Sequence, residues 1–176
     1  MKENVEPHGD CGTIKVNINI KTTYRLDKNM MKTQDYTFKT GNAICYSGFR
    51  QDQSPIDHIY PNYNQVFEDL KILEKHVSYI RLYDSAEHAK TVLQVIDKEK
   101  LNLKVMIGVC LNAEMNNNNC PWGGNHTEEQ LNKNKDINMK DMINLIKLAN
   151  KYKDIVFAVA VGNEATVDWS DHLVPV

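Results

Sequence analysis

The sequence lacks the charge and the apolar stretches that mark several large classes of protein. Its 21 basic and 23 acidic residues leave a net charge of −2, which gives no electrostatic footprint for nucleic acid or an anionic membrane. No apolar run approaches the length of a membrane span, and the polar start at residues 1–4 contains no hydrophobic signal core. We therefore expect a soluble, cytoplasmic protein with no nucleic-acid or membrane partner. The alternative is an extracellular or cell-wall location, which is expected if an upstream segment is missing from the chain.

Motifs for binding metals and phosphates are absent from the sequence as well. The four cysteines, Cys11, Cys45, Cys110 and Cys120, show no Cys-x-x-Cys pairing and no histidine at zinc spacing. We expect buried free thiols, with a bridge between Cys110 and Cys120 open only in an oxidising compartment. No Gly-rich phosphate loop follows any predicted strand, which argues against a nucleotide ligand. The sequence therefore predicts neither a metal site nor a cofactor.

The length and composition predict one globular domain with an N-terminal extension. A chain of 176 residues that is 41% hydrophobic can bury one good-sized core. The extension covers residues 1–40 and begins with a polar tail. A segment of period-two alternation at 13–24 and a weaker strand signal at 36–38 predict a β-hairpin outside the main sheet. The domain itself covers residues 41–176.

Within this domain, apolar runs of strand length alternate with apolar stripes of helical spacing. Strands are expected at 43–46, 78–84, 103–109 and 155–161, and the first of them, which is short and apolar, is expected to be buried. Helices are expected after three caps, which are Asn62 with Gln65, Ser85, and Thr127 with Gln130. The core stripe expected on the third helix consists of Met139, Met142, Ile143, Ile146 and Ala149. This alternation is typical of right-handed βαβ units, as in a doubly wound sheet or a (β/α)₈ barrel.

The second predicted strand favours the barrel because its two faces differ. One face is aliphatic and suits packing against helices, while Arg81 and Tyr83 lie on the other face. Placing such side chains in an enclosed interior is costly unless they are paired or reach a wet site at the end of the strand. Arg81 is therefore expected either to form an internal ion pair, with Asp84 or Glu164, or to bind a substrate.

The fourth predicted strand, 155–161, is a run of seven apolar residues that predicts burial on both faces. Asn163 and Glu164 follow it closely. Ligands of parallel α/β folds bind beyond the carboxyl ends of the strands, so this pair is positioned for chemistry. Small residues at Ala158 and Ala160, on the face that Glu164 shares, leave room for a ligand. The alternative is that Glu164 is a solvated loop acid or lies in the first turn of a following helix.

The loop 111–126 is long for a connection between a strand and a helix, and such loops are usually functional or mobile. It contains Glu114, an acid that could bind sugar or lie on the surface, and Trp122, which stands between Pro121 and a Gly-Gly pair. An indole at this edge can stack on a pyranose, because one side of the sugar ring presents C–H groups to a π face. The alternative is that Trp122 plugs the end of the barrel.

Four strand segments in this order resemble the successive strand motifs of glycoside hydrolase family 17, the β-1,3-glucanases and related enzymes. The segments are Ala-Ile-Cys-Tyr-Ser at 43–47, Tyr-Ile-Arg-Leu-Tyr at 79–83, Val-Met-Ile-Gly-Val at 105–109 and Val-Ala-Val-Gly-Asn-Glu at 159–164. The resemblance begins near Asn42 and is most specific at the last of them. Two loop sequences, 119–124 and 168–176, are similar to those of microbial members.

The resemblance implies a (β/α)₈ barrel and a retaining, two-carboxylate hydrolysis of O-glycosyl bonds in β-1,3-glucan. Glu164 would be the general acid/base, with its pKa raised by burial at an enclosed strand end. Asn163 would hydrogen-bond the hydroxyl next to the anomeric carbon. Arg81 and Tyr83 would line the central sugar subsite, with Tyr46 under the same site from the first strand. Two carboxyl groups suffice for this chemistry, so no metal or cofactor is implied.

The family's nucleophile is a Glu on the seventh strand, and this chain ends at Val176, after the fourth predicted strand. A full barrel takes about 250 residues, so we expect the first half of one. Neither Glu114 nor Asp84 is a convincing substitute nucleophile. Either the chain is a piece of a longer enzyme, or a second half-barrel or a second copy closes it. The alternatives are a non-catalytic glucan-binding remnant and an unrelated parallel α/β protein that binds a small ligand.

Overall fold

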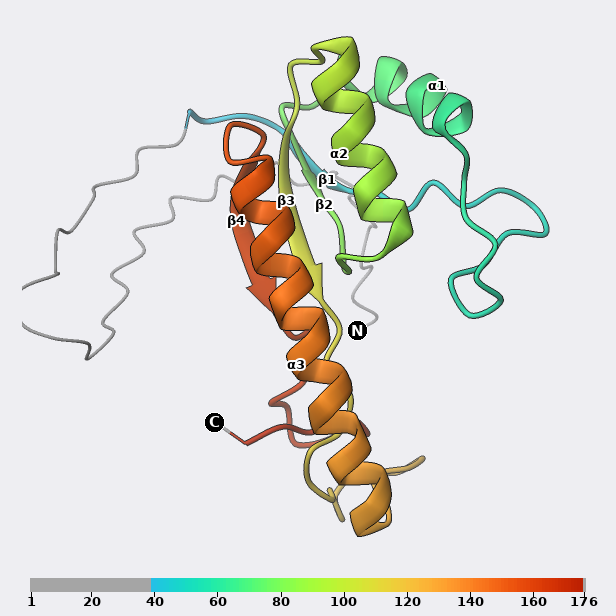
Figure 1. Cartoon of the computed structure of the whole chain (residues 1–176), viewed down its shortest axis with the longest axis vertical. Helices are drawn as coiled ribbons and strands as arrows, with labels where there is room; N and C mark the ends of the chain where they lie inside the picture. The colour runs from blue at the N-terminus through green and yellow to red at the C-terminus, as the bar shows by residue number, and fades with distance from the viewer. Residues whose placement is uncertain (1–38, 176) are drawn as a thin grey trace, which may run out of the picture. The chain divides into compact units, whose positions relative to one another are not determined.

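The computed structural model describes residues 39–175, so the predicted N-terminal hairpin lies outside the described residues. All described elements belong to a unit that begins at Ala43. In chain order they are β1 (Ala43–Cys45), α1 (Tyr63–Leu73), β2 (Tyr79–Arg81), α2 (Glu87–Glu99), β3 (Lys104–Val109), α3 (Glu128–Lys151) and β4 (Val156–Val161). The four strands form one parallel sheet in the order β1-β2-β3-β4 (Figure 1). The predicted α/β class, with strands and helices in alternation, is confirmed.

Two of the three predicted helix caps are confirmed. The Asn62 side chain accepts a hydrogen bond from the Gln65 backbone at 3.1 Å, and the Gln65 side chain accepts one from the Asn62 backbone at 2.9 Å. Thr127 and Gln130 form the same reciprocal pair at the start of α3, at 3.2 and 2.8 Å. Each pair satisfies two backbone N–H groups that the helix cannot bond internally.

The predicted cap at Ser85 is wrong. The N-cap of α2 is Ala86, which makes no side-chain capping bond. The Asp84 carboxylate instead accepts a hydrogen bond from the Ala86 backbone at 2.8 Å, and Ser85 is buried. An Asp that bonds the backbone two residues ahead forms a local turn, which competes with capping by the next hydroxyl.

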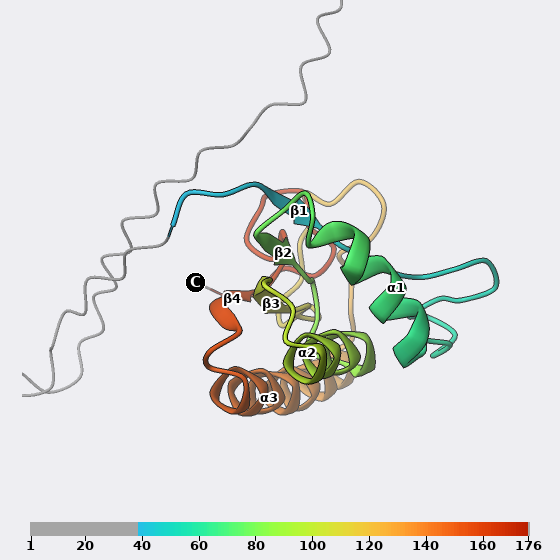
Figure 2. The same ribbon diagram turned by 90° about the horizontal axis from the view of Figure 1, so that it is seen from above.

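The helices cover one face of the sheet, and the core lies between them and the strands. Figure 2 shows α2 and α3 side by side on that face. Ile80 in β2 and Leu82, which directly follows it, point into this core as predicted, and each is 1% exposed. No helix within residues 39–175 has the length and apolar character needed to cross a membrane.

The prediction that β4 is buried on both faces is wrong. Val159 is 47% exposed and Val161 is 56% exposed, because β4 is an edge strand with β3 as its one neighbour in the described sheet. The predicted burial of the first strand is also wrong, since Ala43–Cys45 is exposed at the opposite edge. Runs of Val and Ile indicate a strand but do not reveal whether a further strand covers it.

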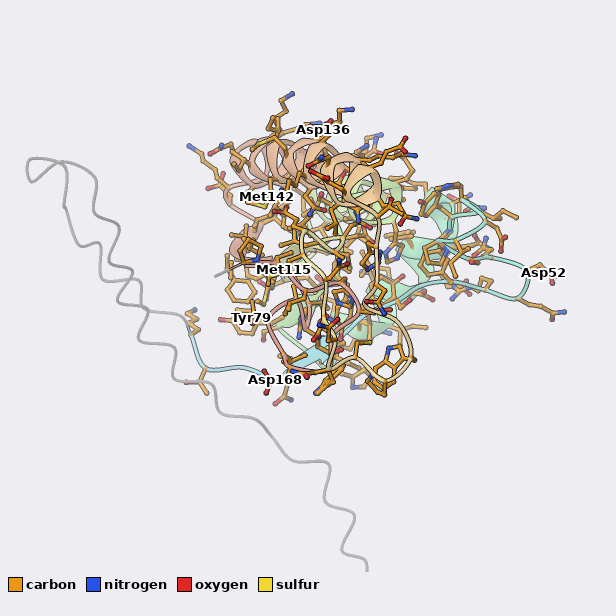
Figure 3. All side chains as sticks on the ribbon, turned by 90° about the horizontal axis from the view of Figure 1, so that it is seen from below. Asp52, Tyr79, Met115, Asp136, Met142 and Asp168 are labelled. Carbon is orange, nitrogen blue, oxygen red and sulfur yellow. The ribbon has the colours of Figure 1, made fainter. Side chains whose placement is uncertain are left out.

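The core stripe predicted on α3 is wrong for three of its members. Met139, Ile143 and Ile146 are 63%, 44% and 53% exposed, while Leu145 and Leu148 are buried against the sheet. Met142 packs against the core, as predicted (Figure 3). The helix therefore carries two adjacent apolar stripes, and the described residues cover one of them.

His88, in α2, is a buried titratable group at the centre of an aromatic cluster. Its ring lies 5.4 Å from the Tyr46 ring and 5.2 Å from the Phe49 ring, and it accepts a hydrogen bond from the Gly48 backbone at 3.4 Å. Burial lowers the pKa of His88, an effect that the nearby carboxylates of Asp84 and Asp69 partly oppose. The folded protein therefore holds this imidazole in its neutral form.

Stability should fall when the pH drops below the ordinary histidine pKa of about 6.5. In that range the unfolded chain binds a proton that the buried imidazole of His88 resists, so protonation favours unfolding. Urea unfolding near pH 7.5 and near pH 5.5 measures the effect. The substitution His88→Gln should make the difference between the two conditions smaller, and an unchanged difference would show that other groups cause it.

The cap at α1 provides a test with an internal control. Asn62→Ala should lower the free energy of unfolding by about 1 kcal/mol, because it removes the acceptor for the Gln65 backbone. Asn64→Ala, an exposed position of the same helix, should be neutral or slightly stabilising, because alanine has the higher helix propensity. Chemical denaturation of both variants measures this. Equal losses would contradict the assigned cap.

Candidate active site

The predicted site residues lie at the carboxyl ends of the strands, where the loops after β3 and β4 meet. Figure 3 looks onto this end of the sheet. Met115, from the loop after β3, lies near the middle of the view, and Asp168, from the segment after β4, lies below it, toward the lower edge of the described residues. The backbone carbonyl of Leu173 accepts hydrogen bonds from the backbones of Glu114 and Met115 at 3.0 and 3.3 Å. The two connections are thus joined directly.

Arg81 links the second strand to the predicted catalytic pair. Its register partners, Met106 on β3 and then Ala158 on β4, place it on the sheet face away from the helices, as predicted. A guanidinium nitrogen, Nη2, donates to Asn163 Oδ1 at 3.1 Å, and the guanidinium carbon lies 4.6 Å from the centroid of the Tyr83 ring. The structure therefore brings together three predicted residues from distant parts of the chain.

The internal ion pair considered for Arg81 is absent. Within residues 39–175 Arg81 pairs with no carboxylate, neither Asp84 nor Glu164. Its Nε atom is buried without a hydrogen-bond partner among the same residues. A buried donor without a partner is costly, and such groups are unusual outside functional sites.

Glu164 lies in a tight turn directly after β4. Gly162 and Glu164 both adopt left-handed backbone conformations, with φ of 81° and 56°. At Gly162 an added Cβ would lie 3.0 Å from the Ala165 Cβ, so the turn requires glycine. For Glu164 this conformation costs on the order of 1 kcal/mol, and backbone strain of this kind clusters at functional sites.

The expected enclosure of Glu164 is not observed. The residue is exposed, because the sheet is open on this side and no further described strand covers it. The pKa of the nearby Tyr83 phenol is raised, chiefly by a hydrogen bond with the Cys45 side chain. The Arg81 charge acts in the opposite direction, and the negative charge of Glu164 adds a smaller upward contribution.

Among the predicted substrate-binding residues, Tyr46 lies elsewhere and Glu114 has a structural partner. Tyr46 is buried in the core on the helix side, and its hydroxyl donates to Asp69 on α1 at 2.8 Å. It was expected under the sugar site, but β1 ends at Cys45 and the next side chain points to the opposite face of the sheet. Glu114 accepts a hydrogen bond at 2.8 Å from Asn138, a buried residue of α3. Glu114 thus fastens the loop after β3 to that helix.

The structure reveals one residue that the sequence did not single out. His172 lies with Nε2 2.8 Å from the Asn163 carbonyl oxygen and Nδ1 2.6 Å from an Asp171 carboxylate oxygen. Both partners are acceptors, so the ring donates to both only as the protonated imidazolium. The contact joins residues nine positions apart in an irregular segment, and no motif spacing signals it. His172 supports the backbone that carries Glu164.

A cleft of about 540 Å³ adjoins this arrangement, and its lining includes Asn163, His172, Asp171 and His126. No group of three His, Cys, Asp or Glu side chains within residues 39–175 could hold a metal ion. Trp122 is 66% exposed, so it does not plug the end of the sheet in the described structure. Its ring contacts Trp169, at 6.0 Å between centroids. The site thus offers a carboxylate, an amide, a guanidinium and exposed indoles, which suit a neutral polyhydroxylated ligand.

The raised pKa of Tyr83 can be tested by removing its partner. Cys45→Ala should lower the pKa of Tyr83, because the hydrogen bond with the thiol is its largest cause. NMR titration of tyrosine labelled in the ring measures the value. Cys110→Ala is the matched control, because the Cys110 sulfur lies 3.5 Å from the Tyr83 backbone carbonyl rather than at its hydroxyl. An equal change in both variants would contradict the assigned cause.

Comparison with known proteins leaves the family of this chain open. No family model, no curated protein and no solved structure matches it. A functional assignment therefore depends on the residues of the site and on their geometry.

Proposed function

We propose that this chain forms the acid/base half of a retaining glycoside hydrolase that acts on β-1,3-glucan. In this proposal β1 to β4 are the first four strands of a (β/α)₈ barrel. The resemblance of the four strand segments to glycoside hydrolase family 17 supports it. The observation that carries it is the hydrogen bond from Arg81 to Asn163, because it holds the residue before Glu164 at the carboxyl ends of the strands.

Each residue of the group has a part in the proposed chemistry. Glu164 gives its proton to the departing glycosidic oxygen and then takes a proton from the incoming water or sugar hydroxyl. Asn163 uses its side-chain oxygen to accept from Arg81, which leaves the amide nitrogen to donate to the hydroxyl next to the anomeric carbon. Tyr83, 39% exposed beside Arg81, lines the sugar subsite.

A retaining mechanism needs a second carboxylate about 5 Å from the first, across the sugar. Asp84 and Glu114, the two acids considered as substitutes, already have structural partners, since Asp84 bonds the Ala86 backbone and Glu114 bonds Asn138. We propose that the nucleophile comes from a second half-barrel, either continuous with this chain, a separate polypeptide or a second copy. Arg81, which pairs with no described carboxylate, is available to hold it.

The exposed apolar residues at one edge of the sheet support closure by further strands and helices. They are Met139, Ile143 and Ile146 on α3 and Val159 and Val161 on β4. A neighbouring strand would pair with the free edge of β4, and its helix would cover the second stripe of α3. Removing these side chains from water is the physical driving force for that assembly.

A second candidate is a glucan-binding protein without hydrolytic activity. The observation that favours it is that Glu164 is exposed to solvent rather than enclosed. The two candidates differ in whether bound glucan is cleaved.

Glu164→Gln tests the proposed function. In a version of the protein that hydrolyses linear β-1,3-glucan, the substitution should lower the release of reducing sugar by about 100-fold or more, because it removes the proton donor. Glu68→Gln, an exposed residue of α1, should leave the rate unchanged.

Both the 176-residue chain and a version joined to a second half-barrel belong in this assay. Activity in the joined version alone agrees with the proposal. Activity that survives Glu164→Gln would overturn the acid/base assignment. Binding without cleavage in both versions would establish the second candidate.

A further inference from the structure

Two tryptophans from separate loops lie together on the surface beyond the strand ends. Trp122, in the loop after β3, is 66% exposed, and Trp169, in the segment after β4, is 44% exposed. Their ring centroids are 6.0 Å apart and the rings are tilted by 53°. These two residues are all the tryptophan in the chain. A large apolar ring is normally buried, so two in water at one place indicate a binding surface.

A buried asparagine joins the two loops that carry these tryptophans. Asn117 is 5% exposed, and its side-chain nitrogen donates to the backbone carbonyls of Asp168 and Ser170 at 2.8 and 2.7 Å. Those carbonyls belong to the residues on either side of Trp169. The link therefore holds Trp169 by its immediate neighbours rather than through its ring.

The same asparagine also fixes the loop around Trp122. The Asn117 backbone nitrogen donates to the Gly124 carbonyl at 2.8 Å, and its carbonyl accepts from the Cys120 backbone at 3.2 Å. Gly124 and Cys120 lie two residues after and two residues before Trp122. At Gly124, with φ of 87°, an added Cβ would lie 2.3 Å from the Asn117 carbonyl oxygen. One buried residue thus positions both indoles, as a preformed site requires.

One acceptor for hydroxyl groups, the Asp171 carboxylate, lies beside the loop that carries Trp122. A Cβ added at Gly123, the residue after Trp122, would lie 3.3 Å from the Asp171 Cβ, so Asp171 borders the Trp122 loop. Asp171 also lines the cleft of about 540 Å³ that contains Asn163 and His172. Asp171 therefore connects the Trp122 loop with a polar cleft whose lining includes Asn163, the residue before Glu164.

We propose that Trp122 and Trp169 form a sugar-binding subsite separate from the catalytic group, which holds one pyranose ring of a longer β-glucan chain. The C–H face of the ring stacks on an indole, and its equatorial hydroxyls donate to Asp171. The identity of the sugar depends on the proposed function. The subsite gives long glucans an advantage over disaccharides, which cannot occupy it and the cleft together.

Fluorescence of the 176-residue chain tests the proposal directly, since both tryptophans belong to the proposed subsite. Titration with a linear β-1,3-glucan hexasaccharide should change the emission in a saturable way. Maltohexaose, an α-1,4-linked hexasaccharide, should change it less. Absence of any change with the β-1,3-linked sugar would overturn the proposal.

Calorimetric titration of variants separates the subsite from other binding. Trp122→Ala and Trp169→Ala should each weaken hexasaccharide binding by about tenfold, while Trp122→Phe should retain part of the affinity. The matched control is Ile56→Ala, which should bind normally. Ile56 lies on another loop and is 86% exposed, so this substitution also removes an exposed apolar side chain. Unaltered affinity in both alanine variants, with circular dichroism like the unmodified chain, would overturn the assignment.

Failure of the proposed subsite can be distinguished experimentally from failure of the proposed function. Glu164→Gln should lower hydrolysis by about 100-fold or more in a version of the protein that hydrolyses glucan, while the change in tryptophan emission on adding the hexasaccharide remains. Hexasaccharide binding without any hydrolysis would contradict the proposed enzymatic activity and support the proposed subsite. If neither tryptophan substitution changes the rate at which long glucans are hydrolysed, the proposed subsite is contradicted and the proposed enzymatic activity is supported.

Discussion

The hydrogen bond between Arg81 and Asn163 is the contact on which the arrangement of the candidate site depends. It joins the end of β2 to the turn after β4, across β3, and so fixes the segment that carries Glu164. The guanidinium also lies over the Tyr83 ring, and its Nε atom is buried without a hydrogen-bond partner among residues 39–175. His172 supports the same turn through the Asn163 carbonyl. Two independent contacts therefore hold a turn whose backbone is strained at Glu164.

The two faces of the sheet have different roles. The helix side is a packed core in which the polar groups of Tyr46, Asp69 and His88 have partners. The opposite side carries Arg81 and Tyr83, and among residues 39–175 no further layer covers it and no further strand pairs with either edge of the sheet. Stability comes from the first face and the candidate chemistry from the second. A parallel sheet is seldom left uncovered, so this asymmetry is the physical basis for the proposed closing half.

The loops beyond the strand ends owe their order to buried amides. Asn117 joins the segments around Trp122 and Trp169, and Asn138 joins the loop after β3 to α3. An amide can donate and accept at once, so one side chain satisfies several backbone groups that would otherwise be buried without partners. The asparagine-rich composition of the loop after β3 thus has a structural explanation for at least one of its members. The exposed indoles depend on this support.

The sequence by itself determined the order of strands and helices, two of the three caps, and the face on which Arg81 lies, because these depend on local periodicity and on neighbours within a few residues. It did not determine the exposure of β4, the uncovered stripe on α3 or the position of Tyr46, because burial depends on which elements pack nearby. The contacts of Arg81 with Asn163, of His172 with the same residue and of Trp122 with Trp169 were decided by tertiary structure alone. Each contact joins residues that are brought together by the packing of the strand ends and loops. The spacing of these residues in the sequence does not indicate that they are close.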